Sequence, residues 1–169
     1  RAVPKGAALV ITATKDVEFY ENMVADHKTV NLCVVSYEIF AADQDTEASP
    51  ELNSQAEERG LRPIEADYKK DKAYNPYPGR IALHDNDFSN RFWLPTFSND
   101  FGYLWLYKNS GKIPDIAYDG IFAPGGSLQD EDHKLCMQNN GGARFVYLDA
   151  SHDFEGLTND KSPFDCTLN

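Results

Sequence analysis

The residues Val30–Phe40 read VNLCVVSYEIF, a run in which β-branched and aromatic side chains dominate. Such side chains suit the half-buried surface of a sheet, so this run predicts a strand. Upstream of it, Gly6–Thr14 (GAALVITAT) has the same character and predicts another strand. Between the two, Asp16–Val24 fits either a short helix or a third strand, and the sequence leaves both open.

A helix is predicted after these strands, over Pro50–Arg59. Ser49 is a natural N-cap, and proline suits the first helical position. Gly60 can adopt the left-handed conformation that commonly follows a helix. Residues 61–80 are rich in proline and tyrosine, so we expect a loop or an edge segment there.

The second half of the chain contains four further strand candidates, separated by turns that contain glycine, asparagine or aspartate. They are Arg91–Phe97 (RFWLPTF), Tyr103–Tyr107 (YLWLY), Ala117–Phe122 (AYDGIF) and Ala143–Asp149 (ARFVYLD). Consecutive strands with short turns are typical of an antiparallel meander. The expected fold class is therefore α+β, with one main α-helix packed on an antiparallel β-sheet.

Composition narrows the class of protein. The chain has 169 residues, enough for one domain, and 41% of them are hydrophobic, well above what disordered chains show. Asp and Glu number 27 against 16 Lys and Arg, a net charge of −11, which argues against a broad nucleic-acid surface. The longest apolar run, Ala7–Ile11, is too short to span a bilayer, so we expect no membrane insertion.

The histidines and cysteines have none of the spacings of a metal site, and we expect neither metal nor cofactor. His84 and His152 each stand beside an aspartate, as in an acid–base group or in a solvated polar turn. Cys33, Cys136 and Cys166 fit either three reduced thiols or one disulfide and one leftover thiol. The chain opens at arginine without an initiator methionine, which is typical of a processed N-terminus.

Several short motifs occur in one order across residues 45–169. They are Tyr77-Pro78, Leu94-Pro95-Thr96-Phe97, Gly142–Tyr147 (GARFVY), Gly156–Asn159 (GLTN) and Phe164–Thr167 (FDCT). In this order they resemble the fungal guanyl-specific ribonucleases and sarcin-type ribotoxins. The resemblance implies a single microbial ribonuclease-like domain over residues 1–169, with a core at 45–169 and an added N-terminal strand extension, a β-hairpin, at 1–44.

The same resemblance implies that the catalytic machinery is degenerate. Where the family has a histidine, a glutamate, an arginine and a second histidine, this sequence has Gly79, Trp93, Arg144 and Asn159. Glycine, tryptophan and asparagine cannot exchange a proton at neutral pH, so only the arginine is retained. The expected protein is a pseudo-ribonuclease without enzymatic activity.

A ribonuclease-like fold with a degenerate site is similar to the secreted virulence effectors of plant-pathogenic fungi. That similarity implies a Cys33–Cys166 disulfide, secretion after removal of a signal peptide, and action inside host cells. We expect a monomer that binds a host protein or a plant immune receptor. RNA stays open as a weaker alternative partner, since the acidic charge favours protein over RNA. The binding residues expected are Tyr77, Trp93, Tyr103 and Arg144.

Two other hypotheses remain. The first is an active secreted endoribonuclease that uses His84 or His152 together with Glu155 and Arg144. The second is an unrelated secreted binding domain whose motif matches arise by chance.

Overall fold

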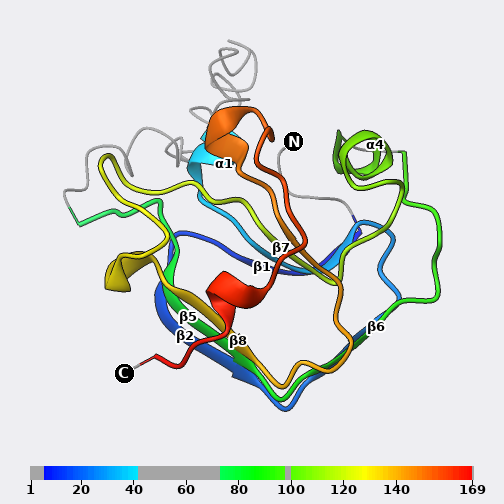
Figure 1. Cartoon of the computed structure of the whole chain (residues 1–169), viewed down its shortest axis with the longest axis horizontal. Coiled ribbons are helices and arrows are strands. Elements are labelled where there is room, and N and C mark those ends of the chain that lie inside the picture. The colour runs from blue at the N-terminus through cyan, green and yellow to red at the C-terminus, as the bar shows by residue number, and fades with distance from the viewer. Residues whose placement is uncertain (1–5, 42–72, 98–99, 169) are drawn as a thin grey trace, which may run out of the picture.

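The computed structural model describes residues 6–41, 73–97 and 100–168, and here the strands wind in successive coils around one axis (Figure 1). In chain order, the strands are β1 (Ala7–Ile11), β2 (Lys15–Tyr20), β3 (Met23–Ala25), β4 (Val30–Val34), β5 (Gly79–His84), β6 (Asp87–Ser89), β7 (Ile116–Tyr118), β8 (Leu135–Gln138) and β9 (Phe145–Tyr147). The first coil comprises β1 to β3 and the second β4 to β6. The third contains β7 and β8, and β9 begins a fourth.

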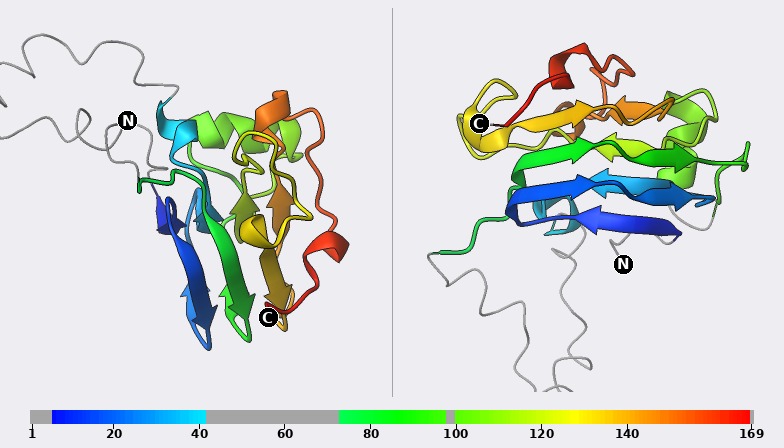
Figure 2. Two further views of the ribbon diagram at one scale, coloured as in Figure 1. Left: turned by 90° about the vertical axis from the view of Figure 1, so that its left-hand side faces the viewer. Right: turned by 90° about the horizontal axis from the view of Figure 1, so that it is seen from below.

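Equivalent strands of successive coils stack into three sheets. Sheet A has the order β1-β4-β7-β9, sheet B the order β2-β5-β8, and sheet C consists of β3 and β6. Every pairing within them is parallel (Figure 2). The architecture is therefore a short parallel β-helix.

The interior of the β-helix is filled by side chains that repeat from coil to coil. Because strand side chains alternate between the two faces, each strand sends every second residue inward. In sheet A the register aligns Leu9, Leu32, Ile116 and Phe145 in one column. In sheet B it aligns Val17, Ile81 and Leu135. All of these residues belong to one apolar cluster, which is the core of the domain.

An asparagine ladder forms the turn that follows sheet B. Asn22, Asn86 and Asn140 occupy the same position in three coils, and Asn86 is only 3% exposed. The Asn86 backbone N–H and Nδ2 both donate to Oδ1 of Asn140, at 3.2 and 2.9 Å. The residue before each asparagine, namely Glu21, Asp85 and Asn139, has a positive φ of 52 to 54°. The ladder thus satisfies buried polar groups at a sharp corner of the coil.

A second layer covers the outer face of sheet A. The outward side chains Cys33, Ala117 and Val146 are fully buried under helix α4 (Asp100–Lys108) and nearby loops. Trp105 of α4 lies in this layer, and its indole Nε1 donates to the Thr29 carbonyl at 2.7 Å. Sheet A therefore has an apolar surface on both faces.

The C-terminal segment covers part of the last coil. Phe164, in the 3-10 turn η3 (Ser162–Phe164), is 1% exposed and packs on Phe145, Tyr118 and Tyr147. Cys166 forms a disulfide with Cys136 of β8. Among the described residues, the remaining short elements are α1 (Glu38–Ala41), η1 (Glu131–His133) and η2 (Ala150–His152).

The structure contradicts the expected fold class. The sheets are parallel, whereas an antiparallel, ribonuclease-like sheet with an N-terminal hairpin was predicted. β1 pairs with β4 and β2 with β5, so the N-terminal strands form no hairpin and belong to the same sheets as the rest. The error has a physical cause: apolar alternation is the same in both kinds of sheet, and the Gly, Asn and Asp turns form corners between sheets instead of hairpins.

Some of the predicted strands and helices are present in the structure, and others are not. The strands expected at 6–14 and 30–40 correspond to β1 and β4, and the undecided 16–24 contains two strands. Residues 103–107 were predicted as a strand but lie in α4, because Phe101, Leu104 and Trp105 are spaced to bury one helical face. Residues 91–97 contain no strand, and the helix predicted at 50–59 lies outside the described residues.

The predicted Cys33–Cys166 disulfide is also wrong. Cys166 bonds to Cys136 at an S–S distance of 2.04 Å, and Cys33 is a buried free thiol. The reason is topological: Cys33 lies beneath the covering layer of sheet A, whereas Cys136 is in sheet B beside the C-terminal segment. In the parts of the chain that the structure describes, no helix is long and apolar enough to cross a bilayer.

Candidate functional site

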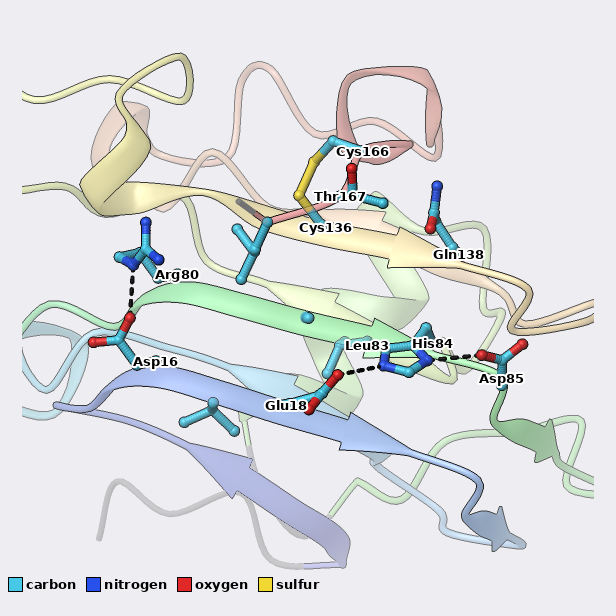
Figure 3. A pocket seen from close by; sticks show the side chains of 13 residues that line it. Asp16, Glu18, Arg80, Leu83, His84, Asp85, Cys136, Gln138, Cys166 and Thr167 are labelled. Atoms are coloured by element: carbon cyan, nitrogen blue, oxygen red, sulfur yellow. Dashed lines mark hydrogen bonds and ion pairs between the residues drawn. A yellow bond between two sulfur atoms is a disulfide. The ribbon is translucent and has the colours of Figure 1, made fainter.

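The outer face of sheet B carries a groove lined by ionisable side chains (Figure 3). Its volume is about 440 Å³. The alternation of β2 and β5 points Asp16, Glu18, Arg80 and His84 outward, while their neighbours along each strand point into the core. The same strand pattern that builds the core therefore builds the groove.

His84 lies at one end of the groove, held between two carboxylates. Its Nδ1 is 2.7 Å from Asp85 Oδ2 and its Nε2 is 2.9 Å from Glu18 Oε1. Hydrogen bonds with Asp85 and then Glu18 raise the pKa of His84, and the bond with His84 lowers the pKa of Asp85. Both shifts favour an imidazolium flanked by two ionised carboxylates.

Arg80 and Asp16 close the other end of the groove. The Arg80 Nε donates to Asp16 Oδ1 at 2.6 Å. Both residues have a positive φ, 52° and 57°, so β2 and β5 share the same local distortion at this position. With a rise of about 3.3 Å per residue, Arg80 and His84 are separated by about 13 Å along β5.

In the middle of the groove, the floor is formed by a small side chain and one wall by a disulfide. Ala82 lies between Glu18 and Cys136 in the sheet, and its methyl group leaves the floor low. The Cys136–Cys166 disulfide and the following Thr167 form one side. At the His84 end, the Tyr20 ring stacks on the imidazole with a centroid distance of 5.2 Å and an interplanar angle of 6°.

The groove has the properties of a binding surface. Both ring nitrogens of His84 already have carboxylate partners, so neither is available to take a proton from a substrate. The carboxylates have remaining lone pairs, and the Gln138 amide and the Thr167 hydroxyl add donors to the lining. The groove can therefore offer several donors and acceptors to one molecule.

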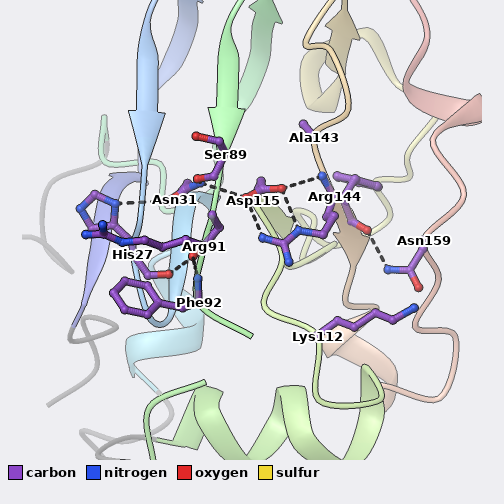
Figure 4. A network of polar contacts seen from close by, with 12 residues as sticks. His27, Asn31, Ser89, Arg91, Phe92, Lys112, Asp115, Ala143, Arg144 and Asn159 are labelled. Atoms are coloured by element: carbon purple, nitrogen blue, oxygen red, sulfur yellow. Dashed lines mark hydrogen bonds and ion pairs between the residues drawn. The ribbon is translucent and has the colours of Figure 1, made fainter. Parts of the chain in front are cut away.

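Arg144, the residue expected to survive from a catalytic site, forms an ion pair with a buried aspartate (Figure 4). Its Nε and Nη2 donate to the two oxygens of Asp115, at 3.0 and 3.1 Å, and Asp115 is only 3% exposed. Asn31 Nδ2 donates to Asp115 Oδ1 at 2.9 Å. The register puts Asn31, Asp115 and Arg144 directly before the Leu32, Ile116 and Phe145 column, so Arg144 neutralises a buried carboxylate of sheet A.

The other predicted site residues are dispersed. Trp93 is 80% exposed, and Tyr103 projects outward from α4. Gly79 begins β5 where a Cβ would lie 1.8 Å from the Asp132 carbonyl, so its role is steric. Asn159 donates to the Phe145 carbonyl at 2.7 Å, near Arg144. Tyr77 has an edge contact with His133, and burial raises its pKa.

His84 and His152, the histidines proposed for an active ribonuclease, lie in other parts of the fold than Arg144. His84 lies in the sheet B groove, whereas Arg144 pairs with Asp115 before β9. His152 follows the far end of β9 and pairs with Asp149 at 2.7 Å. That contact raises the pKa of His152, with a further contribution from the negative charge of Glu155.

Sequence reasoning singled out His84 but missed Asp16, Glu18, Tyr20 and Arg80 as its neighbours. Their pairing depends on a register between residues 64 positions apart, which no local pattern reveals. One signal was present in the sequence: the pairs Glu21-Asn22, Asp85-Asn86 and Asn139-Asn140 mark equivalent corners. Aligning the chain on these pairs places Tyr20, His84 and Gln138 side by side.

In the described ranges, no cluster of three His, Cys, Asp or Glu side chains is arranged to hold a metal ion. Comparison of the chain with family models, curated proteins and solved structures finds no match. The groove of sheet B and the coil architecture are therefore the observations that bear on function.

Proposed function

We propose that this protein is a secreted, non-catalytic binding protein that holds a neutral saccharide in the groove on the outer face of sheet B. The observation that carries the proposal is the row of outward-facing ionisable groups around the low floor at Ala82. A saccharide hydroxyl group both donates and accepts a hydrogen bond. It can therefore donate to Glu18 or Asp16 and accept from the Gln138 amide or the Thr167 hydroxyl, which also line the groove.

The charges in the groove favour a neutral ligand. Asp16, Glu18 and Asp85 contribute three negative charges, and Arg80 with protonated His84 contributes two positive ones. A polyanion such as RNA meets a small net negative charge here, in a chain whose total is −11. A dication has no cluster of unpaired carboxylates, because each carboxylate already has a cationic partner.

The contacts of His84 in the groove support binding over catalysis. A general base needs a free lone pair near its substrate, and both nitrogens of His84 are engaged. The Arg144 guanidinium is engaged with Asp115. These contacts support the expected lack of enzymatic activity, which remains a prediction.

Secretion is supported by the disulfide. The chain contains a Cys136–Cys166 disulfide. Structural disulfides are typical of proteins in oxidising compartments, where they persist. The host-directed effector role expected from the sequence stays a prediction, and the ribonuclease-like fold on which it rested is absent from the described residues.

The test is a screen of the full chain against neutral and acidic oligosaccharides, followed by calorimetric titration of the best ligand. Ala82→Trp fills the floor of the groove and should weaken binding at least about tenfold. Glu18→Gln should weaken it less, since it removes charge but keeps an acceptor. Glu155→Gln, at an exposed position outside the groove, is the matched control and should leave affinity unchanged.

Two results would contradict the proposal. One is saccharide binding that Ala82→Trp leaves intact, which would place the ligand elsewhere. The other is selective binding of acidic saccharides, which would contradict the charge argument.

A further inference from the structure

A second cavity lies at the C-terminal end of the β-helix, where the asparagine ladder stops. Its volume is about 590 Å³, and its polar lining includes Asn139, Asn140, Lys161, Ser162 and Asp165. Met137 and Phe145, from the last inward columns of the core, form apolar parts of the wall. Figure 1 shows the C-terminal turn η3 lying over this end, beside β8.

Each rung of the ladder binds the side-chain carboxamide of the next rung in the same way. The backbone N–H and Nδ2 of Asn22 both donate to Asn86 Oδ1, at 3.1 and 3.3 Å. The same two groups of Asn86 donate to Asn140 Oδ1. The carboxamide oxygen thus always receives two hydrogen bonds from the preceding rung.

The carboxamide nitrogen follows an equally regular pattern. Asn86 Nδ2 donates to the Phe19 carbonyl at 2.9 Å, and Asn140 Nδ2 donates to the Leu83 carbonyl at 2.7 Å. Phe19, Leu83 and Met137 are in register across sheet B. The next carbonyl in the series therefore belongs to Met137, which lines the cavity.

Asn140 is the last rung, and its donors have no following carboxamide. Among the described residues, nothing accepts a hydrogen bond from the Asn140 backbone N–H, and Nδ2 donates only to Leu83. By the pattern of the earlier rungs, these donors point away from the second coil, toward the cavity that Asn140 lines. The Asn140 N–H and Nδ2 donors and the Met137 carbonyl acceptor therefore have the arrangement that binds an asparagine carboxamide at the two earlier rungs.

We propose that this cavity is a binding site for a small molecule that carries a primary carboxamide. The ligand oxygen accepts from the Asn140 N–H and Nδ2, and its amide nitrogen donates to the Met137 carbonyl. An alkyl portion lies against Met137 and Phe145. A carboxylate can reproduce the first two contacts but not the third, because it has no N–H.

This site is separate from the sheet B groove, and the proposal does not depend on saccharide binding. The groove lies on the outer face of β2, β5 and β8, and the cavity is bounded by the end of the coil and the C-terminal segment. The two cavities share only Gln138 in their linings.

The test is an amide proton NMR titration of the full chain with propionamide. We expect saturable shifts of the Asn140 backbone and side-chain signals, and at least about tenfold weaker binding of propionate. N-acetylglucosamine, titrated in parallel, shows whether a secondary amide is also accepted. N-acetylglucosamine should bind more weakly than propionamide if the site is specific for a primary carboxamide.

Ser162→Phe adds bulk to the rim of the cavity without touching the ladder and should reduce propionamide binding at least about tenfold. Ser151→Phe is the matched control, an exposed serine in another 3-10 turn outside the cavity, and should have no effect. Absence of saturable shifts with propionamide would overturn the proposal. So would equal affinity for propionate, tighter binding of N-acetylglucosamine, or unchanged binding to Ser162→Phe.

Discussion

The outer faces of sheet A and sheet B differ in almost every respect, although the two sheets belong to the same coils. On sheet A, outward residues such as Cys33 and Val146 are fully buried beneath α4 and the loops. On sheet B, the outward residues are ionisable or small and line an open groove. The insertions between strands therefore decide which face of a β-helix is structural and which is available to a ligand.

Cysteine illustrates the contrast within one residue type. Cys33 in sheet A is 0% exposed, and burial, followed by the negative charge of Asp119, raises the pKa of its thiol to about 12. Cys136 in sheet B is bonded to Cys166 and forms the wall of the groove. The face that is covered by packing has an inert thiol, and the face that lacks such a cover is bridged to the C-terminal segment by a disulfide.

The largest effect is expected from placing a charge on each outer face. Ala117 in sheet A is fully buried, and Ala82 in sheet B lies on the groove floor. Ala117→Lys puts an unpaired ammonium under α4 and should cost about 3–5 kcal/mol of unfolding free energy. Ala82→Lys keeps its ammonium near Glu18 and solvent and should change stability by about 0.5 kcal/mol or less.

Urea denaturation followed by circular dichroism measures both variants. If Ala117→Lys does not fold, Ala117→Ser gives a smaller loss that is still measurable. Equal losses for the two lysine variants would show that the outer face of sheet B is as covered as that of sheet A.

The next largest effect concerns the two kinds of cysteine. Cys166→Ser opens a loop of 30 residues and should cost about 3–4 kcal/mol through the entropy of the unfolded chain. Mass spectrometry after alkylation checks the pairing directly. The native chain should take up no label, and mild reduction should label Cys136 and Cys166 but leave buried Cys33 unmodified until the chain unfolds.

Adding reductant to Cys166→Ser is the control and should not lower its stability further. Labelling of Cys33 in the reduced but folded chain would mean that sheet A is not sealed by its covering layer.

The sequence predicted strands better than it predicted their partners. β1 and β4 were recognisable from their β-branched residues, since that signal is local. Their pairing was not, because Ala7 aligns with Val30 and Leu32 with Ile116 only after long connections are left out. Helix α4 was missed for a related reason: aromatic residues in YLWLY favour a strand locally, and the contact of Trp105 with sheet A overrides that preference.

The candidate site was predictable only in part. His84 was singled out because it stands beside Asp85, and that pairing is present. Glu18 and Arg80 needed the coil register, which the repeated asparagine corners encode over separations of 64 and 54 residues. Short repeats interrupted by insertions of different length give no fixed period, so a search for regular spacing does not find them.

The smallest effect is a pH dependence that separates the two sheets. Asp119, directly after β7 of sheet A, is 0% exposed, and burial raises its pKa to about 7 although the Ser36 and Ile121 N–H groups donate to it. The other titratable groups coupled to this carboxyl are Cys33, Tyr118 and Tyr147. Since an aspartate in the unfolded chain has a pKa of about 3.9, the folded state binds more protons between these values.

Stability from Asp119 should therefore be greatest near pH 4 and should fall as pH rises through about 7. His84 in sheet B also has a raised pKa, so its contribution is present below about 6.5 and is lost at higher pH. Because His84 is solvent-screened and Asp119 is buried, His84→Gln should leave most of the decline between pH 5.5 and 8.5, and Asp119→Asn should remove most of it. Urea midpoints at four pH values across this range measure the decline. A decline abolished by His84→Gln alone would assign the pH dependence to the exposed sheet and contradict the burial argument for sheet A.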